Sequence, residues 1–216
     1  MTRASAKRPR RARRTYHHGD LRRALVDAAV AIIAEQGAEA FTLREAARRL
    51  GVNHRAAYRH FADKAALLAA VAEQGFRGLI ETTQAEAASV TGPAQRLAAA
   101  ARAYVAFAAA HPAHFRVMFG PRLNEGAERK RRKSSSPFVT VDALVEEAYR
   151  MLEAQVREGM AAGIFANDPG PHPVIALWAA MHGLASLVLM KRVDVPPGKL
   201  AAWVDRIFDR ALRGLR

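Results

Sequence analysis

The segment from Thr42 to Phe61 constrains the fold of this chain most, because it holds two helix starts separated by a single glycine-containing turn. Thr42 and Glu45 fit a capping box, in which a threonine side chain caps a helix and the glutamate reaches back to it. Gly51 ends this first helix, and Asn53 can cap a second short helix. Two short helices joined in this way are typical of a helix-turn-helix.

The rest of the chain also carries helical patterns, and no stretch shows the alternation of a strand. Ala, Leu and Arg dominate, and this mixture favours helix over strand. We therefore predict an all-α fold of about nine helices. With their caps, the predicted helices span residues 20–36, 42–50, 53–61, 63–88, 94–110, 114–119, 139–162 and 174–190, and a last one opens at 196–197.

Positive charge is concentrated at the N-terminal end. The chain has 34 Lys and Arg against 20 Asp and Glu, and residues 1–14 hold seven arginines and lysines but no acid. Such an excess is expected where one end of a protein faces a polyanion. We predict that residues 1–15 form a disordered basic arm, with a solvated tail that binds nothing specific as the alternative. A second basic run, Arg129–Lys133, falls in a predicted loop over 120–136.

The second helix of a helix-turn-helix enters the major groove of DNA, and the first helix crosses the backbone. Arg55 suits a bidentate contact with guanine, and Ala56 suits contact with a thymine methyl group. Alternatively, Tyr58 and His60 pack on the first predicted helix, over 20–36, and the arginines form a solvated face. The predicted DNA-binding residues are Thr42, Arg44, Asn53, His54, Arg55, Ala56, Tyr58, Arg59, His60 and Lys64.

Several other functions lack support in the sequence. There is no cysteine, so disulfides and thiolate chemistry are excluded, and we find no Ser-His-Asp set, phosphate-binding loop or cofactor motif. His111 and His114 lack a nearby acid to complete a metal site, and His17 and His18 would point apart on a helix. We expect no signal peptide and no apolar run of roughly 18 residues, hence a cytoplasmic protein that does not enter a membrane.

The N-terminal pattern resembles the tetracycline-repressor (TetR) family of transcriptional regulators over residues 15–80. The chain departs from the family at Arg55, where Ser, Gly or Ala is common, and at Ala56 and Ala57, where Thr-Leu or Ala-Pro is common. The DNA operator is therefore not transferable from relatives. The resemblance rests on Tyr16–Arg22, Phe41–Ala47, Gly51–Asn53 and Tyr58–Lys64.

The C-terminal half carries a shorter likeness. Pro112 with Phe115–Gly120, and Trp178 followed by His182 and Gly183, resemble the sensing domain of the subgroup named after its Trp-His-Gly signature. The resemblance implies a DNA-binding domain over 16–62 and a ligand-sensing and dimerisation domain over 63–216.

What the resemblance implies for function is a homodimer whose two recognition helices each read one half-site of duplex DNA. It also implies that Thr42, Tyr58, His60 and Lys64 hold phosphates. We expect a repressor that a small-molecule effector releases from its operator. The alternatives are a DNA-binding regulator without a ligand, and an enzyme with a basic tail.

Two sets of residues in the C-terminal half are candidates for these roles. A ligand pocket is expected from aromatic and polar side chains between the middle helices, with a filled core as the alternative. The pocket candidates are Tyr104, Phe107, His111, Phe115, Met118, Phe119, Tyr149, Leu152, Trp178 and His182.

A dimer interface is expected on the last two helices, where small side chains allow close approach and two helices from each chain would form a four-helix interface. The alternative is that both helices are buried within one chain. The candidate interface residues are Ala179, Ala180, Gly183, Leu187, Trp203 and Ile207.

Overall fold

A computed structural model describes residues 18–120, 138–168 and 170–215, and this part of the chain contains helices and no strand. The all-α prediction of about nine helices is therefore confirmed for the described residues. The predicted arm over 1–15 and the basic run Arg129–Lys133 lie outside them. The helices are α1 His18–Ala40, α2 Leu43–Arg49, α3 His54–His60, α4 Lys64–Ala88, α5 Pro93–Ala110, α6 Pro112–Met118, α8 Phe138–Ala161, α9 His172–Leu189 and α10 Leu200–Arg213.

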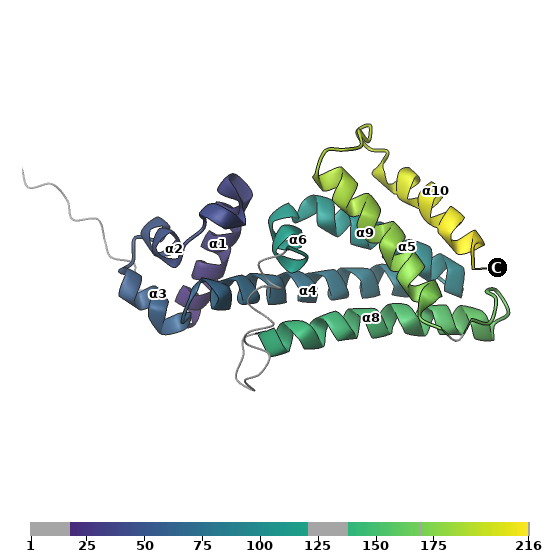
Figure 1. Ribbon diagram of the computed structural model, residues 1–216, viewed down its shortest axis with the longest axis horizontal. Helices are drawn as coiled ribbons and strands as arrows, with labels where there is room; N and C mark the ends of the chain where they lie inside the picture. Colours follow the sequence, from purple (N-terminus) through teal and green to yellow (C-terminus); the bar gives the residue numbers. More distant parts are fainter. Residues whose placement is uncertain (1–17, 121–137, 169, 216) are drawn as a thin grey trace, which may run out of the picture.

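The first three helices form a small head at one end of the molecule, and α4 runs from this head through the rest of the structure (Figure 1). Leu25, Ile32 and Phe41 are fully buried in the head, and Leu67 and Val71 from the start of α4 are buried as well. Burial of apolar side chains is the main stabilising term in folding. The beginning of α4 therefore belongs to the core of the head.

The second half of α4 lies among the helices of the larger domain. Helices α5, α6 and α8 pack against α4, and α9 and α10 pack against α5 (Figure 1). Helix α6 also contacts α1, so it lies where the head meets the larger domain. No flexible linker separates the two parts, because a single helix of 25 residues belongs to both.

Several helix boundaries differ from the prediction, and three of the differences have a clear physical reason. The first helix, predicted to end at residue 36, is interrupted at Gly37, which leaves helical geometry at φ 82° and ψ 164°, but a short helical turn continues to Ala40. Helix α6 begins at Pro112, because proline is accommodated in the first turn of a helix. The last helix begins at Leu200 rather than at 196–197, because Gly198 adopts a left-handed φ of 74° that interrupts it.

The expectation that no apolar run reaches membrane-spanning length is wrong. Helix α9 has 18 residues with a mean hydropathy of 1.5, which is long and apolar enough by length and composition alone. This helix packs against α5, α8 and α10, and 33% of it is buried within the chain. A core or interface helix of a soluble protein has the same composition, so α9 is weak evidence for a membrane.

Candidate DNA-binding surface and ligand cavity

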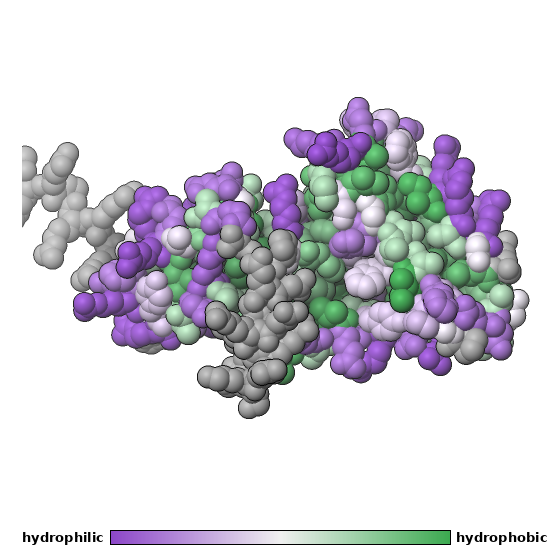
Figure 2. All heavy atoms as spheres, in the orientation of Figure 1, coloured by the Kyte–Doolittle hydropathy of each residue, from purple (hydrophilic) through white to green (hydrophobic). Residues whose placement is uncertain are grey.

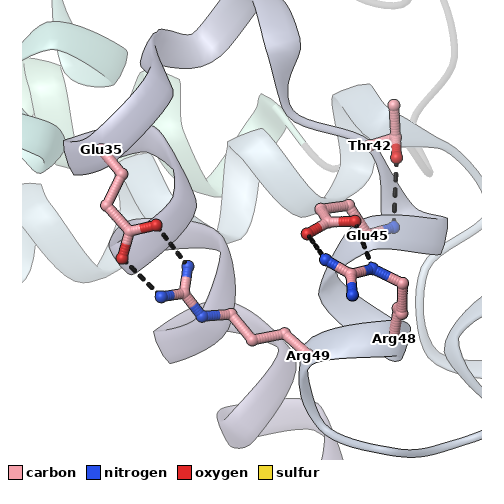
Figure 3. Close-up of polar contacts among 5 residues, drawn as sticks. All are labelled: Glu35, Thr42, Glu45, Arg48 and Arg49. Atoms are coloured by element: carbon pink, nitrogen blue, oxygen red, sulfur yellow. Dashed lines mark hydrogen bonds and ion pairs between the residues drawn. The ribbon is translucent and has the colours of Figure 1, made fainter.

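The start of α2 is fixed by Thr42, as predicted. Its backbone is extended, and its hydroxyl oxygen accepts a hydrogen bond from the Glu45 N–H at 3.1 Å (Figure 3). The Glu45 carboxylate instead accepts hydrogen bonds from the Arg48 guanidinium, at 2.8 and 2.6 Å. Hydrogen bonding by Arg48 lowers the pKa of Glu45 below its usual value. The threonine half of the capping box is thus present, whereas the glutamate is held by Arg48.

A second ion pair joins α2 to α1. Arg49 donates to both carboxylate oxygens of Glu35 in a forked arrangement, with one N–O distance of 3.0 Å (Figure 3). This hydrogen bonding lowers the pKa of Glu35. Exposed ion pairs add little to stability, so the contact matters mainly for the angle between the two helices.

Helix α3 presents an exposed row of cationic and aromatic side chains. Asn53 caps it as predicted, because its side-chain oxygen accepts a hydrogen bond from the Arg55 N–H at 2.9 Å. Ala57 is fully buried where α3 meets α2. That contact leaves the opposite face of α3 open. His54, Arg55, Tyr58 and Arg59 are exposed, and Ala56 and His60 are partly buried.

Lys64, a predicted phosphate contact, is engaged at the end of the head. Its ammonium donates a hydrogen bond to the Glu39 carbonyl at 3.0 Å and lies 5.7 Å from the centre of the Phe41 ring. Burial lowers the pKa of Lys64. An ammonium has three donors, so a phosphate contact would have to share this group with the Glu39 carbonyl.

The remaining predicted DNA contacts, Thr42, Arg44 and Asn53, are exposed on the same small domain. The sequence reasoning overlooked Arg22. Its guanidinium lies 5.1 Å above the Phe61 ring, directly after α3. Since this contact joins residues 39 positions apart, no local pattern could have indicated it.

The larger domain contains a cavity of about 340 Å³ between α4, α5, α8 and α9. Five of the ten predicted ligand residues line it: Tyr104, Phe119, Tyr149, Leu152 and Trp178. The cavity therefore lies between the middle helices, as expected. Twelve further residues line it: Phe76, Leu79, Ile80, Thr83, Ala100, Asp142, Val145, Glu146, Ala148, Met151, Gln155 and Met181.

The other five predicted ligand residues lie outside the cavity wall. Phe115 and His182 stack on one another with ring centres 5.4 Å apart, and Phe107 packs against His111 at 4.7 Å. Met118 is buried where α6 meets α4, close to Gly75. Phe107, Phe115 and Met118 are therefore core residues behind the cavity wall, whereas His182 is partly buried and His111 is exposed.

One polar contact joins the cavity wall to this support. The Tyr104 hydroxyl lies 2.9 Å from His182 Nδ1, and only 7% of Tyr104 is exposed. Burial raises the pKa of Tyr104 well above its usual range, with a smaller opposing effect from a hydrogen bond with Trp178. Burial also lowers the pKa of His182. Both side chains are therefore neutral near pH 7.

The described residues contain no group of three or more His, Cys, Asp or Glu side chains that would hold a metal ion. The pair His111 and His114 shows a packing contact instead, with ring centres 5.9 Å apart. Burial and the neighbouring His111 lower the pKa of His114.

The three-helix head with its exposed α3 and the helical domain with its cavity define a helix-turn-helix regulator of transcription. Residues 97–215 match the family described as tetracyclin repressor-like, C-terminal domain, and residues 25–71 match the bacterial regulatory proteins of the tetR family. The first match alone covers more than half of the chain. The protein belongs to the tetR family and is a DNA-binding transcriptional regulator.

Solved structures agree with this assignment. A protein of unknown function from Rhodococcus sp. RHA1 is 30% identical, with a TM-score of 0.76 and coverage of 94% of this chain and 99% of that one. The TetR family regulator PfmR from Thermus thermophilus is 21% identical, with a TM-score of 0.67 and coverage of 89% and 98%. FadR from Bacillus subtilis, solved with stearoyl-CoA, is 16% identical, with a TM-score of 0.69 and coverage of 90% and 99%.

The last two likenesses concern the fold alone. No curated protein matches the chain. The matching family, PfmR and FadR are transcriptional regulators. The likeness to the Trp-His-Gly subgroup is not confirmed by these matches and stays a prediction.

Proposed function

We propose that this regulator is a cytoplasmic homodimeric repressor that a small, mainly apolar ligand releases from its DNA operator. The observation that carries the proposal is that α4 forms part of both the head core and the cavity wall. Leu67 and Val71 are buried in the head, and Leu79 and Thr83 line the cavity on the same helix. A ligand that moves α4 would therefore also move the head.

The DNA-binding part of the proposal rests on the exposed face of α3. His54, Arg55 and Arg59 are exposed to solvent, and an arginine such as Arg55 can make a bidentate contact with guanine. Contacts to several phosphates by each head predict a log–log dependence of affinity on salt with a slope of roughly −5 to −8 for a dimer.

The homodimer is supported by an uncovered apolar face on α9. Ile175 is 48% exposed, Leu187 44% and Met190 65%. Between them on this face lie Ala179 and Gly183, and a Cβ atom added at Gly183 would meet no atom within 4 Å. Figure 2 shows hydrophobic side chains gathered on the surface of the larger domain around α9, in contrast to the hydrophilic head.

The second helix of the proposed interface is α10. Val204 and Phe208 are buried against the chain, and Trp203 and Ile207 are partly buried on the flank of that stripe. We expect the exposed apolar side chains of α9 and the flank of α10 to form a four-helix contact with a second copy. Replacing Leu187 with Glu places a charge in that contact, and we expect sedimentation to show a shift from dimer to monomer.

The ligand part of the proposal is supported by the cavity between the middle helices. A ligand shifts a two-state equilibrium only by its difference in affinity for the two states, and a shift from 1:99 to 99:1 needs about 5.5 kcal/mol. The ligand must therefore bind the form with displaced heads far more tightly than the DNA-bound form.

The test has two stages. Selection of duplex fragments by the purified protein identifies an operator, and fluorescence anisotropy then measures its affinity while candidate apolar ligands are added. We expect a palindromic site and a loss of affinity with at least one ligand. A protein that shows no preference among duplex sequences would contradict DNA-binding regulation. A tightly bound ligand without any effect on operator affinity would contradict release.

A further inference from the structure

The polar groups around the cavity define the class of ligand. No Lys, Arg or His is found among the described residues that line it. A carboxylate or phosphate inside would lack a cationic partner, and burying an unpaired charge is very costly. The cavity wall is therefore unsuited to an anionic ligand.

The two carboxylates of the wall are on α8, one turn apart. Glu146 is exposed and forms an ion pair with Arg150 at 3.1 Å, so it belongs to the rim, and Asp142 is partly buried. Both would repel an anionic group that projected from the cavity towards solvent. An ammonium group would gain little from Glu146, because this carboxylate is already paired and is surrounded by water.

Deeper in the wall, the polar groups are uncharged. The Thr83 hydroxyl donates to the Leu79 and Ile80 carbonyls at 2.8 and 3.0 Å. Tyr104 also lines the cavity, and its hydroxyl is held at 2.9 Å from His182 Nδ1. A hydroxyl group has one donor and two acceptor positions. His182 and Trp178 occupy two of these positions on Tyr104, so one position remains for a ligand.

We propose that the ligand is an uncharged, largely apolar molecule with one hydroxyl or carbonyl oxygen, and that the Tyr104 hydroxyl binds this oxygen. The inference rests on the proposed function for its role in regulation, and it adds the chemical class of the ligand and the residue that selects it. His182 acts as a positioning residue, because it holds the Tyr104 hydroxyl and stacks on Phe115 outside the cavity.

Three probes with the same carbon chain test the class: decan-1-ol, decanoate and decylammonium at pH 7.5. Binding to the full-length protein, with both tryptophans retained, is followed by the change in tryptophan fluorescence, because Trp178 lines the cavity. We expect decan-1-ol to bind at least about tenfold more tightly than either charged probe. Equal or tighter binding of a charged probe, or no binding of decan-1-ol, would overturn the proposal.

Two tyrosine variants test whether Tyr104 binds the ligand oxygen. Tyr104→Phe should weaken decan-1-ol binding by about 3- to 10-fold, the effect of one lost hydrogen bond. Tyr149→Phe is the matched control, because Tyr149 also lines the cavity but lies on α8, and we expect a change within about twofold. An unchanged Tyr104→Phe variant, or a larger loss in Tyr149→Phe, would show that Tyr104 does not select the ligand.

The failure of this inference can be distinguished from the failure of the proposed function. Operator affinity is measured with the same probes by anisotropy. Selective binding of decan-1-ol without operator release would refute ligand-relieved repression and leave the ligand class standing. Release of the operator by decanoate instead would support ligand-relieved repression and overturn the proposal that the ligand is uncharged.

Discussion

Gly159 lies on α8 directly beneath the ring of Phe165, and replacing it with alanine should destabilise the protein. A Cβ atom at this position would approach Cε2 and Cδ2 of Phe165 more closely than 3.0 Å, a distance that real Cβ contacts essentially never show. Phe165 is 4% exposed, and its N–H donates to the Gly159 carbonyl at 3.3 Å. The ring therefore cannot move away without disturbing both the core and the turn after α8.

The expected magnitude follows from two opposing effects. Alanine is favoured over glycine in a helix interior by about 1 kcal/mol. Overpacking a core costs about 1–3 kcal/mol. Because the Phe165 ring is rigid and its backbone is held by a hydrogen bond, we expect the cost at Gly159 to be about 3 kcal/mol. We expect Gly159→Ala to lower the free energy of unfolding by about 2 kcal/mol, measured as a shift of the urea midpoint.

Two controls separate these effects. Ala154→Gly, at an exposed position of α8, measures the helix preference alone and should destabilise by about 1 kcal/mol. In a Phe165→Ala background the ring is absent, so Gly159→Ala should there stabilise by about 1 kcal/mol. The reasoning is refuted if Gly159→Ala stabilises the otherwise unchanged protein.

Three further predictions concern the head and its junction with the larger domain. Arg55→Ala should weaken binding to the selected operator by about 1–3 kcal/mol in anisotropy titrations. The control Arg77→Ala removes a cation that is paired with Glu73 on α4, and it should leave operator affinity nearly unchanged. Equal losses of affinity in the two variants would place Arg55 outside the groove. Asn53→Ala removes the cap of α3 and should lower stability by about 1 kcal/mol in urea unfolding; no loss would mean that the cap is dispensable. Burial lowers the pKa of His114, so the unfolded chain binds more protons than the folded chain below about pH 6.5. The contribution of neutral His114 to folding stability is fully present above that pH and is lost as the pH falls. His114→Gln should therefore flatten the decline of the urea midpoint between pH 7.5 and 5.5. An equally steep decline in the variant would exclude His114 as a cause.

Local signals were read correctly from the sequence where the interaction spans only a few residues. The Thr42, Asn53 and Asp63 caps each join a side chain to a backbone N–H two or three positions later, so the pattern contains both partners. Glu45 shows the limit of such reasoning. Arg48 lies three positions further on and binds its carboxylate, and the sequence alone does not tell which partner wins.

Contacts over long distances could not be predicted in this way. Phe76 and Leu79 line the cavity, but whether apolar side chains of α4 face a solid core or a cavity depends on where α8 lies. Lys64 was assigned to phosphate, and the carbonyl that it binds is 25 positions earlier. The order of helices follows from the sequence, whereas the cavity follows from their mutual placement.

Because α4 is one continuous helix, a small tilt at its end near the cavity becomes a larger displacement of the head at its other end. At 1.5 Å per residue its 25 residues extend for about 38 Å. A tilt of about 5° acting over roughly 20 Å of this length displaces the far end by nearly 2 Å. In a dimer the two heads would shift together against half-sites set about 34 Å apart by the pitch of DNA. A lever of this kind would let a ligand of a few carbon atoms uncouple both recognition helices from their grooves.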